Sequence, residues 1–114
     1  PIDKDERWKL YKEKMDYILS FSSVFAISDF YALDFMAFME AEGKRIPQDI
    51  SLIGFDGSLS AQQFNLTTIT QDHIQRAYYA VESLEEFRRN EMKNRVKVVD
   101  VSLKEGLTVR RLCD

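Results

Sequence analysis

Three short segments of the sequence that are predicted to be strands end in polar side chains that could bind a ligand. Ser28 and Asp29 follow the first segment, Asp56 follows the second, and Thr70 and Gln71 follow the third. Carboxylates and side-chain amides suit a polyhydroxylated ligand, because each can accept or share two hydrogen bonds with neighbouring hydroxyl groups. Position alone leaves simpler roles open. A helix cap is the favoured role for Asp29, and a turn explains Asp56 as well as a ligand contact does.

Motifs that would indicate an enzyme are incomplete in this chain. Residues 55–59, Phe-Asp-Gly-Ser-Leu, are similar to part of the Asp-x-Asp-Gly-Thr/Ser loop of haloacid dehalogenase-type phosphatases, whose first Asp is the nucleophile. Gly54 stands at that first position, so phosphoaspartate chemistry would lack its attacking carboxylate. The single histidine, His73, belongs to no Ser-His-Asp set that we can assemble, and the sequence has no glycine-rich phosphate loop. We therefore expect no enzymatic activity.

The composition excludes several other kinds of site and partner. One cysteine, Cys113, and one histidine provide no ligand set for a metal ion, and we expect neither a metal nor a cofactor. With 16 basic against 19 acidic residues, the net charge of −3 gives no electrostatic case for direct contact with nucleic acid. No apolar run approaches the roughly 18 residues of a membrane span, so we expect a soluble, cytoplasmic protein without membrane contact.

The elements that must position these side chains alternate between helix and strand. The spacing of apolar residues predicts helices over residues 3–19, 29–42 and 72–92, strands over residues 24–27, 50–55, 66–70 and 96–103, and a last extended piece over residues 107–112. Such alternation is typical of a parallel sheet with helices on its faces. Ligands of open parallel sheets bind at the carboxyl ends of the strands, so the three polar groups should meet along one edge.

The helix predicted for residues 29–42 is apolar nearly all round. One stripe combines Phe30, Leu33, Met36 and Ala37, and much of the remaining surface carries Tyr31, Phe35, Phe38 and Met39. A helix of this kind must be covered on two sides. We expect the sheet to cover one side and a partner subunit to cover the other.

Two blocks of the sequence, and a weaker third, are similar to one known family. The first block is VFAISDFYALDFMAFMEAEGKRIPQDISLIGFDGS, which starts at Val24 and contains an apolar strand, a Ser-Asp pair, an Ala-Leu helix and Gly-Phe-Asp. The second is Leu-Thr-Thr-Ile at residues 66–69, followed by Gln71. The third runs from Val99 to Arg110. In this order and spacing, the blocks resemble the LacI/GalR family of transcription regulators.

The resemblance implies a fold class and a domain organisation. The fold class is α/β: an incomplete, parallel-sheet, three-layer lobe of the periplasmic-binding-protein-like (type I) fold. The chain would be the carboxyl-terminal portion of an effector-binding domain. Residues 1–71 would form mostly its carboxyl-terminal lobe, residues 72–95 a helix that packs on an amino-terminal lobe, and residues 96–114 the closing strands. On that helix, apolar spacing predicts an inward face of Ile74, Ala77, Tyr78, Val81 and Leu84.

The resemblance also implies a function. The chain would be the effector-sensing and dimerisation part of a transcription repressor that responds to a sugar or sugar phosphate, with operator DNA bound only through an amino-terminal helix-turn-helix domain. The implied effector-binding residues are Ser28, Asp29, Asp56, Gln71 and His73. The implied homodimer interface consists of Leu33, Met36, Ala37, Gln62 and Phe64. Two alternatives stay open: a solute-binding receptor of a sugar transporter, which shares the fold, and a small α/β enzyme.

Overall fold

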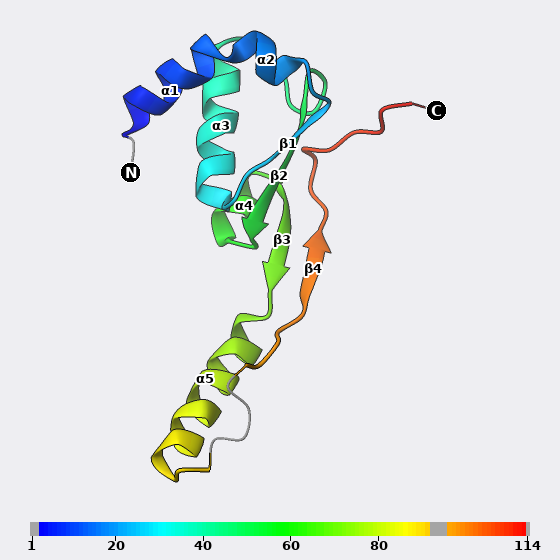
Figure 1. Cartoon of the computed structure of the whole chain (residues 1–114). Coiled ribbons are helices and arrows are strands. Elements are labelled where there is room, and N and C mark those ends of the chain that lie inside the picture. The colour runs from blue at the N-terminus through cyan, green and yellow to red at the C-terminus, as the bar shows by residue number, and fades with distance from the viewer. Residues whose placement is uncertain (1–2, 92–95, 114) are drawn as a thin grey trace.

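The structure is a computed structural model of the chain, and it describes residues 3–91 and 96–113 (Figure 1). The elements begin with α1 (Lys4–Glu13), α2 (Met15–Leu19), β1 (Ser23–Phe25), α3 (Asp29–Ala41) and β2 (Ser51–Asp56). They continue with α4 (Leu59–Gln63), β3 (Thr67–Gln71), α5 (His73–Arg88) and β4 (Val101–Lys104). The predicted alternation of helix and strand is confirmed as far as β4, but β4 is shorter than the strand predicted over residues 96–103, and residues 107–112 form no strand. The first predicted helix is divided at Lys14, whose backbone, at φ −100° and ψ 8°, leaves the helical conformation.

The four strands of the described chain form one sheet in the order β1-β2-β3-β4. The first three are parallel: Phe25 pairs with Ile53, and Asp56 pairs with Thr70. β4 is antiparallel to β3. The chain leaves β3 into α5, which lies beyond the end of the sheet, and it returns from that same end, so β4 must run the opposite way (Figure 1). The parallel part of the sheet was predicted; the direction of β4 depends on where α5 lies.

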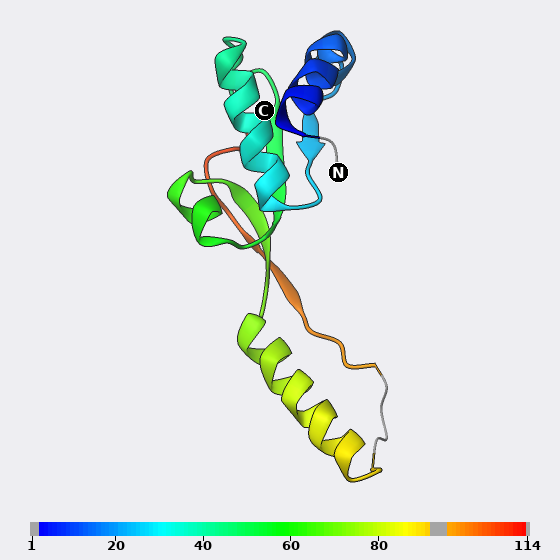
Figure 2. The same cartoon turned by 90° about the vertical axis from the view of Figure 1, so that its left-hand side faces the viewer.

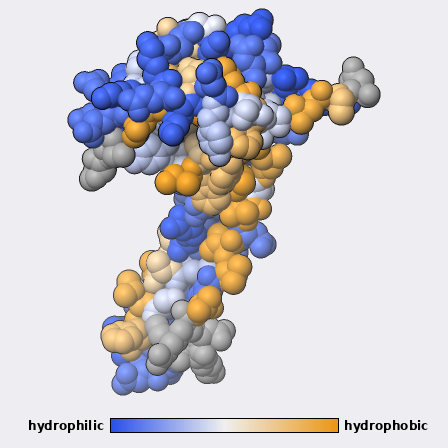
Figure 3. Space-filling view, turned by 45° about the horizontal axis from the view of Figure 1, so that its top comes forward, coloured by the Kyte–Doolittle hydropathy of each residue, from blue (hydrophilic) through white to orange (hydrophobic). Residues whose placement is uncertain are grey.

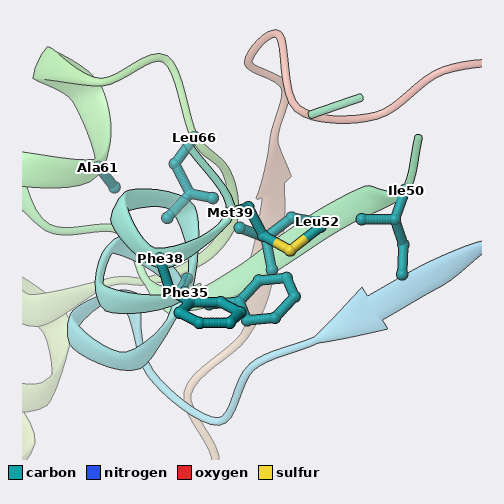
Figure 4. Close-up of a cluster of buried hydrophobic side chains, with 8 residues drawn as sticks. Phe35, Phe38, Met39, Ile50, Leu52, Ala61 and Leu66 are labelled. Atoms are coloured by element: carbon teal, nitrogen blue, oxygen red, sulfur yellow. The ribbon is translucent and has the colours of Figure 1, made fainter. Parts of the chain in front are cut away.

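The hydrophobic core lies between α3 and the sheet. Its buried apolar members are Ala32, Phe35, Phe38, Met39, Ile50, Leu52, Ala61 and Leu66 (Figure 4). Burial of one large apolar side chain stabilises a fold by about 1.5–3 kcal/mol, so this cluster supplies much of the driving force for folding. α1 packs beside α3. The Trp8 ring meets the Phe38 ring edge-on at 5.6 Å between centroids, and Trp8 Nε1 donates a hydrogen bond to Asp34 Oδ1 at 3.1 Å.

α1 and α3 stand side by side on one face of the sheet (Figure 2). The connections from β1 to β2 and from β2 to β3 advance in the same direction across the sheet. Right-handed connections that advance in one direction place their helices on one face, which explains why α3 and α4 share it. The other face carries Phe25, Phe55 and Leu103, and Phe25 and Leu103 are 57% and 58% exposed. The described residues therefore form two of the three predicted layers.

α5 stands away from the sheet, and Figure 3 shows hydrophobic side chains open to solvent from the sheet down to this helix. None of its described residues is buried, and the predicted inward face of Ile74, Ala77, Tyr78, Val81 and Leu84 is exposed. That prediction is wrong for the described chain, because α5 extends beyond the sheet and its apolar face is left uncovered. A different face of α5 contacts the chain that returns toward the sheet. There Lys97 Nζ donates hydrogen bonds to Glu82 Oε2 at 2.6 Å and to Glu86 Oε1 at 3.3 Å.

Candidate functional site

The candidate site lies where β1, β2 and β3 end. These strands are parallel, so their carboxyl ends share one edge of the sheet, as predicted. Ser28 precedes α3, Asp56 is the last residue of β2, and Gln71 is the last residue of β3. Ser28 Oγ accepts a hydrogen bond from the Tyr31 amide at 3.4 Å, so Ser28 caps α3. The favoured prediction that Asp29 is this cap is therefore wrong, because the preceding residue fills the position.

The backbone at the end of β2 is strained. Asp56 has a φ of +134° and Gly57 a φ of +74°, in a region that residues other than glycine rarely adopt. Glycine is needed at position 57, because a Cβ there would lie 2.9 Å from Thr70 Cα. A non-glycine residue in such a conformation costs about 1–3 kcal/mol and persists only where the surrounding structure enforces it. Asp56 ends β2, and residues 56–58, which lead from this strand to α4, are called the Asp56 turn below. Asp56 lies at this edge of the sheet, beside a hollow.

The Asp29 carboxylate is buried beside this turn, with an exposed fraction of 2%. Its Oδ2 accepts a hydrogen bond from the Ser58 amide at 2.7 Å. Its Oδ1 accepts one from the Thr68 hydroxyl at 2.5 Å, and the Thr68 oxygen accepts one from the Gly57 amide at 3.3 Å. The structure thus places Asp29 beside the Asp56 turn, where its two carboxylate oxygens accept hydrogen bonds from protein groups.

His73 and Gln71 approach the turn from the β3 side. His73 is exposed, and its Nε2 lies 3.3 Å from the backbone oxygen of Asp56. Gln71 is half-buried, and its Oε1 accepts a hydrogen bond from Arg76 Nη1 at 2.8 Å. The structure therefore places His73 against the Asp56 turn and leaves Gln71 at the end of the neighbouring strand. Arg76 was missed by the sequence analysis, because nothing in the spacing singled it out.

A hollow of about 590 Å³ opens beside Asp56. Asp56, Ser58 and the predicted site residue Asp29 line it together with Phe30, which is 66% exposed, and Arg7. The predicted dimer residues Leu33 and Ala37 border the same hollow. A hydrogen bond to Asp34 raises the pKa of the Arg7 guanidinium above its ordinary value, so this side chain stays charged. A carboxylate, a hydroxyl, a cation and an aromatic ring together suit a ligand with hydroxyl groups and an apolar face. Sequence analysis missed Phe30, Ser58 and Arg7 here; only Phe30 carried a signal, since it directly follows the Ser-Asp pair.

The outer side of α3 borders a second hollow, of about 400 Å³, which we call the α3 groove. Four of the five predicted dimer residues line it, namely Leu33, Met36, Ala37 and Phe64; Gln62 is exposed and does not. The other side of α3 is buried in the core, so the helix has an apolar surface on two sides, as predicted. Coverage of the groove by a partner subunit stays a prediction.

Two further findings concern metals and membranes. Within residues 3–91 and 96–113, no group of three or more His, Cys, Asp or Glu side chains is arranged to hold a metal ion. Of the helices in that part of the chain, none has both the length and the apolar character needed to cross a bilayer.

Residues 4–111 match the family model described as the periplasmic binding protein-like domain. The chain is 31% identical over 99 residues to the HTH-type transcriptional regulator MalR of Clostridium butyricum. The aligned residues cover 85% of this chain and 28% of MalR. The chain is also 34% identical over 94 residues to the HTH-type transcriptional repressor PurR of Vibrio atlanticus. This alignment covers 80% of this chain and 28% of PurR. The chain thus spans little more than a quarter of the length of these relatives.

Solved structures of LacI-family regulators have the same fold. A regulator from Corynebacterium glutamicum superposes with a TM-score of 0.77 at 26% identity, over 95% of this chain and 32% of that one. A periplasmic binding protein/LacI transcriptional regulator from Alkaliphilus metalliredigens, complexed with D-xylulofuranose, superposes with a TM-score of 0.71 at 28% identity. The superposition covers 86% of this chain and 38% of that one. The lac repressor dimer bound to operator superposes with a TM-score of 0.76 over 89% of this chain and 31% of that one. At 23% identity, this similarity is evidence for the fold only. The predicted fold class is confirmed.

Proposed function

The chain belongs to the LacI family of transcription regulators, as part of their periplasmic-binding-protein-like effector domain, and from this we propose that it senses a sugar or sugar phosphate. The complete regulator would be a repressor located in the cytoplasm. Its helix-turn-helix domain would contact the operator, and this chain would bind the effector and form the homodimer. Effector binding would shift an equilibrium between two lobe arrangements and so change the affinity for the operator.

The observation that carries this proposal is the strained turn that presents Asp56 at the edge of the sheet. A carboxylate accepts hydrogen bonds from two adjacent hydroxyl groups, which is the pattern that a sugar offers. Ser28, Gln71 and His73 would add ligand contacts from the neighbouring strand ends. Asp29 would contribute to the site through its hydrogen bonds beneath the turn. The D-xylulofuranose bound by the relative from Alkaliphilus metalliredigens supports a polyhydroxylated effector.

Two surfaces support the rest of the proposal. The α3 groove would form the dimer interface, with Leu33, Met36, Ala37 and Phe64 at its centre and Gln62 at its rim. Residues 72–95 would pack on an amino-terminal lobe through the exposed apolar face of α5, and residues 96–114 would return to close the sheet.

The test is Asp56→Ala in the full-length protein, with operator affinity measured in the presence of ribose, xylulose, cellobiose or glucose 6-phosphate. The wild-type protein should change its operator affinity with at least one of these sugars. The variant should bind the operator normally and lose the response, because truncation of a charged hydrogen-bonding partner costs about 2–5 kcal/mol of binding free energy. Asp5→Ala, at an exposed position on α1, is the matched control and should respond like the wild type. A full response in Asp56→Ala would refute the proposed contact.

A further inference from the structure

Among the acidic residues that the structure describes, only Asp29 is buried. A buried carboxylate is costly unless its oxygens accept hydrogen bonds. Both oxygens of Asp29 do so, one from the Ser58 amide at 2.7 Å and the other from the Thr68 hydroxyl at 2.5 Å. Although Asp29 borders the hollow beside Asp56, its exposed fraction of 2% leaves almost no surface for a ligand. Its role must therefore lie in the groups that it holds.

Those groups are the two residues that follow Asp56. The Ser58 amide is held directly by Asp29. The Gly57 amide is held through a relay: it donates to the Thr68 oxygen at 3.3 Å, and the Thr68 hydroxyl donates to Asp29. Asp56 has a positive φ value, which a residue other than glycine keeps only with support from its surroundings, so this turn needs such support to keep its conformation.

Gly54 provides the space that this arrangement needs. It lies on β2, two residues before Asp56, and a Cβ there would come 2.4 Å from Asp29 Oδ1. With no side chain at this position, the carboxylate at the start of α3 reaches across β2 to Thr68 on β3. One hydrogen-bond network therefore joins α3, β3 and the connection that follows β2.

We propose that Asp29 is a positioning residue of the effector site, which holds the turn of residues 56–58 so that the Asp56 carboxylate is in place before the ligand arrives. The proposal rests on the proposed function of Asp56 as a ligand contact. A preformed contact avoids the entropic cost of ordering the turn on binding, so a loosened turn binds the effector more weakly. The relay through Thr68 can be removed without changing either carboxylate.

The test is Thr68→Val in the full-length protein, with Thr68→Ser as the matched control. Valine keeps the shape of threonine and loses the hydroxyl, whereas serine keeps the hydroxyl. In calorimetric titrations with ribose, xylulose, cellobiose and glucose 6-phosphate, Thr68→Val should bind the recognised sugar about tenfold more weakly, and Thr68→Ser should stay within about twofold of the wild type. Operator affinity without sugar should be unchanged in both variants.

Met39→Ala separates positioning from a general loss of stability. Met39 is fully buried in the core, and its truncation should destabilise the fold while leaving the turn and the sugar affinity as they are. Unchanged affinity in Thr68→Val would overturn the proposal. Equal weakening in Thr68→Val and Met39→Ala would overturn it as well, because the effect would then be one of stability alone.

Hydrogen exchange at the Gly57 and Ser58 amides decides the same question without a ligand. Relative to the Leu52 amide in the core of the sheet, both should exchange faster in Thr68→Val and at the wild-type rate in Thr68→Ser and Met39→Ala. Unchanged rates in Thr68→Val would overturn the positioning role. If the wild-type protein binds none of the four sugars, the proposed effector class fails, and these exchange rates still decide whether Asp29 holds the turn.

Discussion

A methyl group at position 54 would occupy space that Asp29 and Leu66 now use. The Cβ would lie 2.4 Å from Asp29 Oδ1 and 2.9 Å from Leu66 Cδ2. We expect Gly54→Ala to lower the free energy of unfolding by about 1–3 kcal/mol, because an added methyl group forces its packed neighbours to shift. Urea denaturation followed by circular dichroism measures this. Ser60→Ala, at an exposed position of α4, should change stability by less than about 0.5 kcal/mol. Equal stability of Gly54→Ala and the wild type would show that Asp29 moves aside without cost.

Residue types at the strand ends were sufficient to place Asp56 at the edge of the sheet, but they could not reveal what Asp29 contacts. Its two donors, Ser58 and Thr68, lie 29 and 39 residues further along the chain. Only the assembled sheet brings such distant residues together, so local spacing favoured a helix cap for Asp29. Ser28 fills that role one residue earlier. Spacing along the chain predicts which side chains are available at an edge, and tertiary structure decides which of them face the ligand.

At the scale of the elements, periodicity predicted which helix faces are apolar, and it predicted correctly only one cover, the sheet against one side of α3. The two apolar sides of α3 were evident from the sequence, and one of them is buried against the sheet. The apolar face of α5 was equally evident, and it is exposed in the described chain. Coverage depends on the neighbours that the topology supplies, and the connection beyond β3 carries α5 away from the sheet (Figure 1).

Lys97 attaches α5 to the returning chain, and its protonation should set a pH limit for that attachment. The hydrogen bond to Glu82, with a further one to Glu86, raises the pKa of Lys97 above its ordinary 10.5. A cation whose pKa is raised by folding contributes stability that is fully present below pH 10.5 and is lost as pH rises through the folded-state pKa. The melting temperature, followed by circular dichroism from about pH 9 to about pH 12, should therefore fall above pH 10.5.

Two variants of Lys97 control for other groups that titrate in this range. Lys97→Arg should lose this alkaline decline, because a guanidinium stays protonated throughout it. Lys97→Met should melt at a lower temperature than the wild type at neutral pH and approach it at high pH. An alkaline decline of the same size in Lys97→Arg would assign the effect to other residues.

The molecule as a whole is more extended than its length predicts. The radius of gyration is 18.3 Å, whereas a compact chain of this length has about 13 Å. The extension comes from α5, which exposes more than 60% of each of the apolar residues Ile74, Tyr78, Val81, Leu84 and Phe87. An apolar surface of this kind marks a contact with another part of a protein or with a partner. It supports the proposal that α5 packs on a second lobe.

The α3 groove is a second candidate contact surface of the molecule, and Leu33→Lys tests its proposed role in the dimer. Leu33 lines this groove, and a lysine there would bring a charge into the interface, which is costly unless the charge is paired. Sedimentation of the full-length protein should show dimers for the wild type and monomers for Leu33→Lys. Leu10→Lys, at a 43% exposed position on α1, should remain dimeric. A dimer of unchanged strength in Leu33→Lys would exclude this face as the interface.

Packing of α5 on a second lobe predicts that its apolar face matters in the complete regulator and not in the 114-residue chain alone. Val81 and Leu84 are 61% and 68% exposed, so the double variant Val81→Glu/Leu84→Glu should melt within about 2 °C of the unmodified chain. In the complete regulator the same variant should melt at least about 5 °C lower, because two carboxylates would then be buried against apolar surface. Equal effects of the double variant in the two proteins would mean that this face stays in solvent.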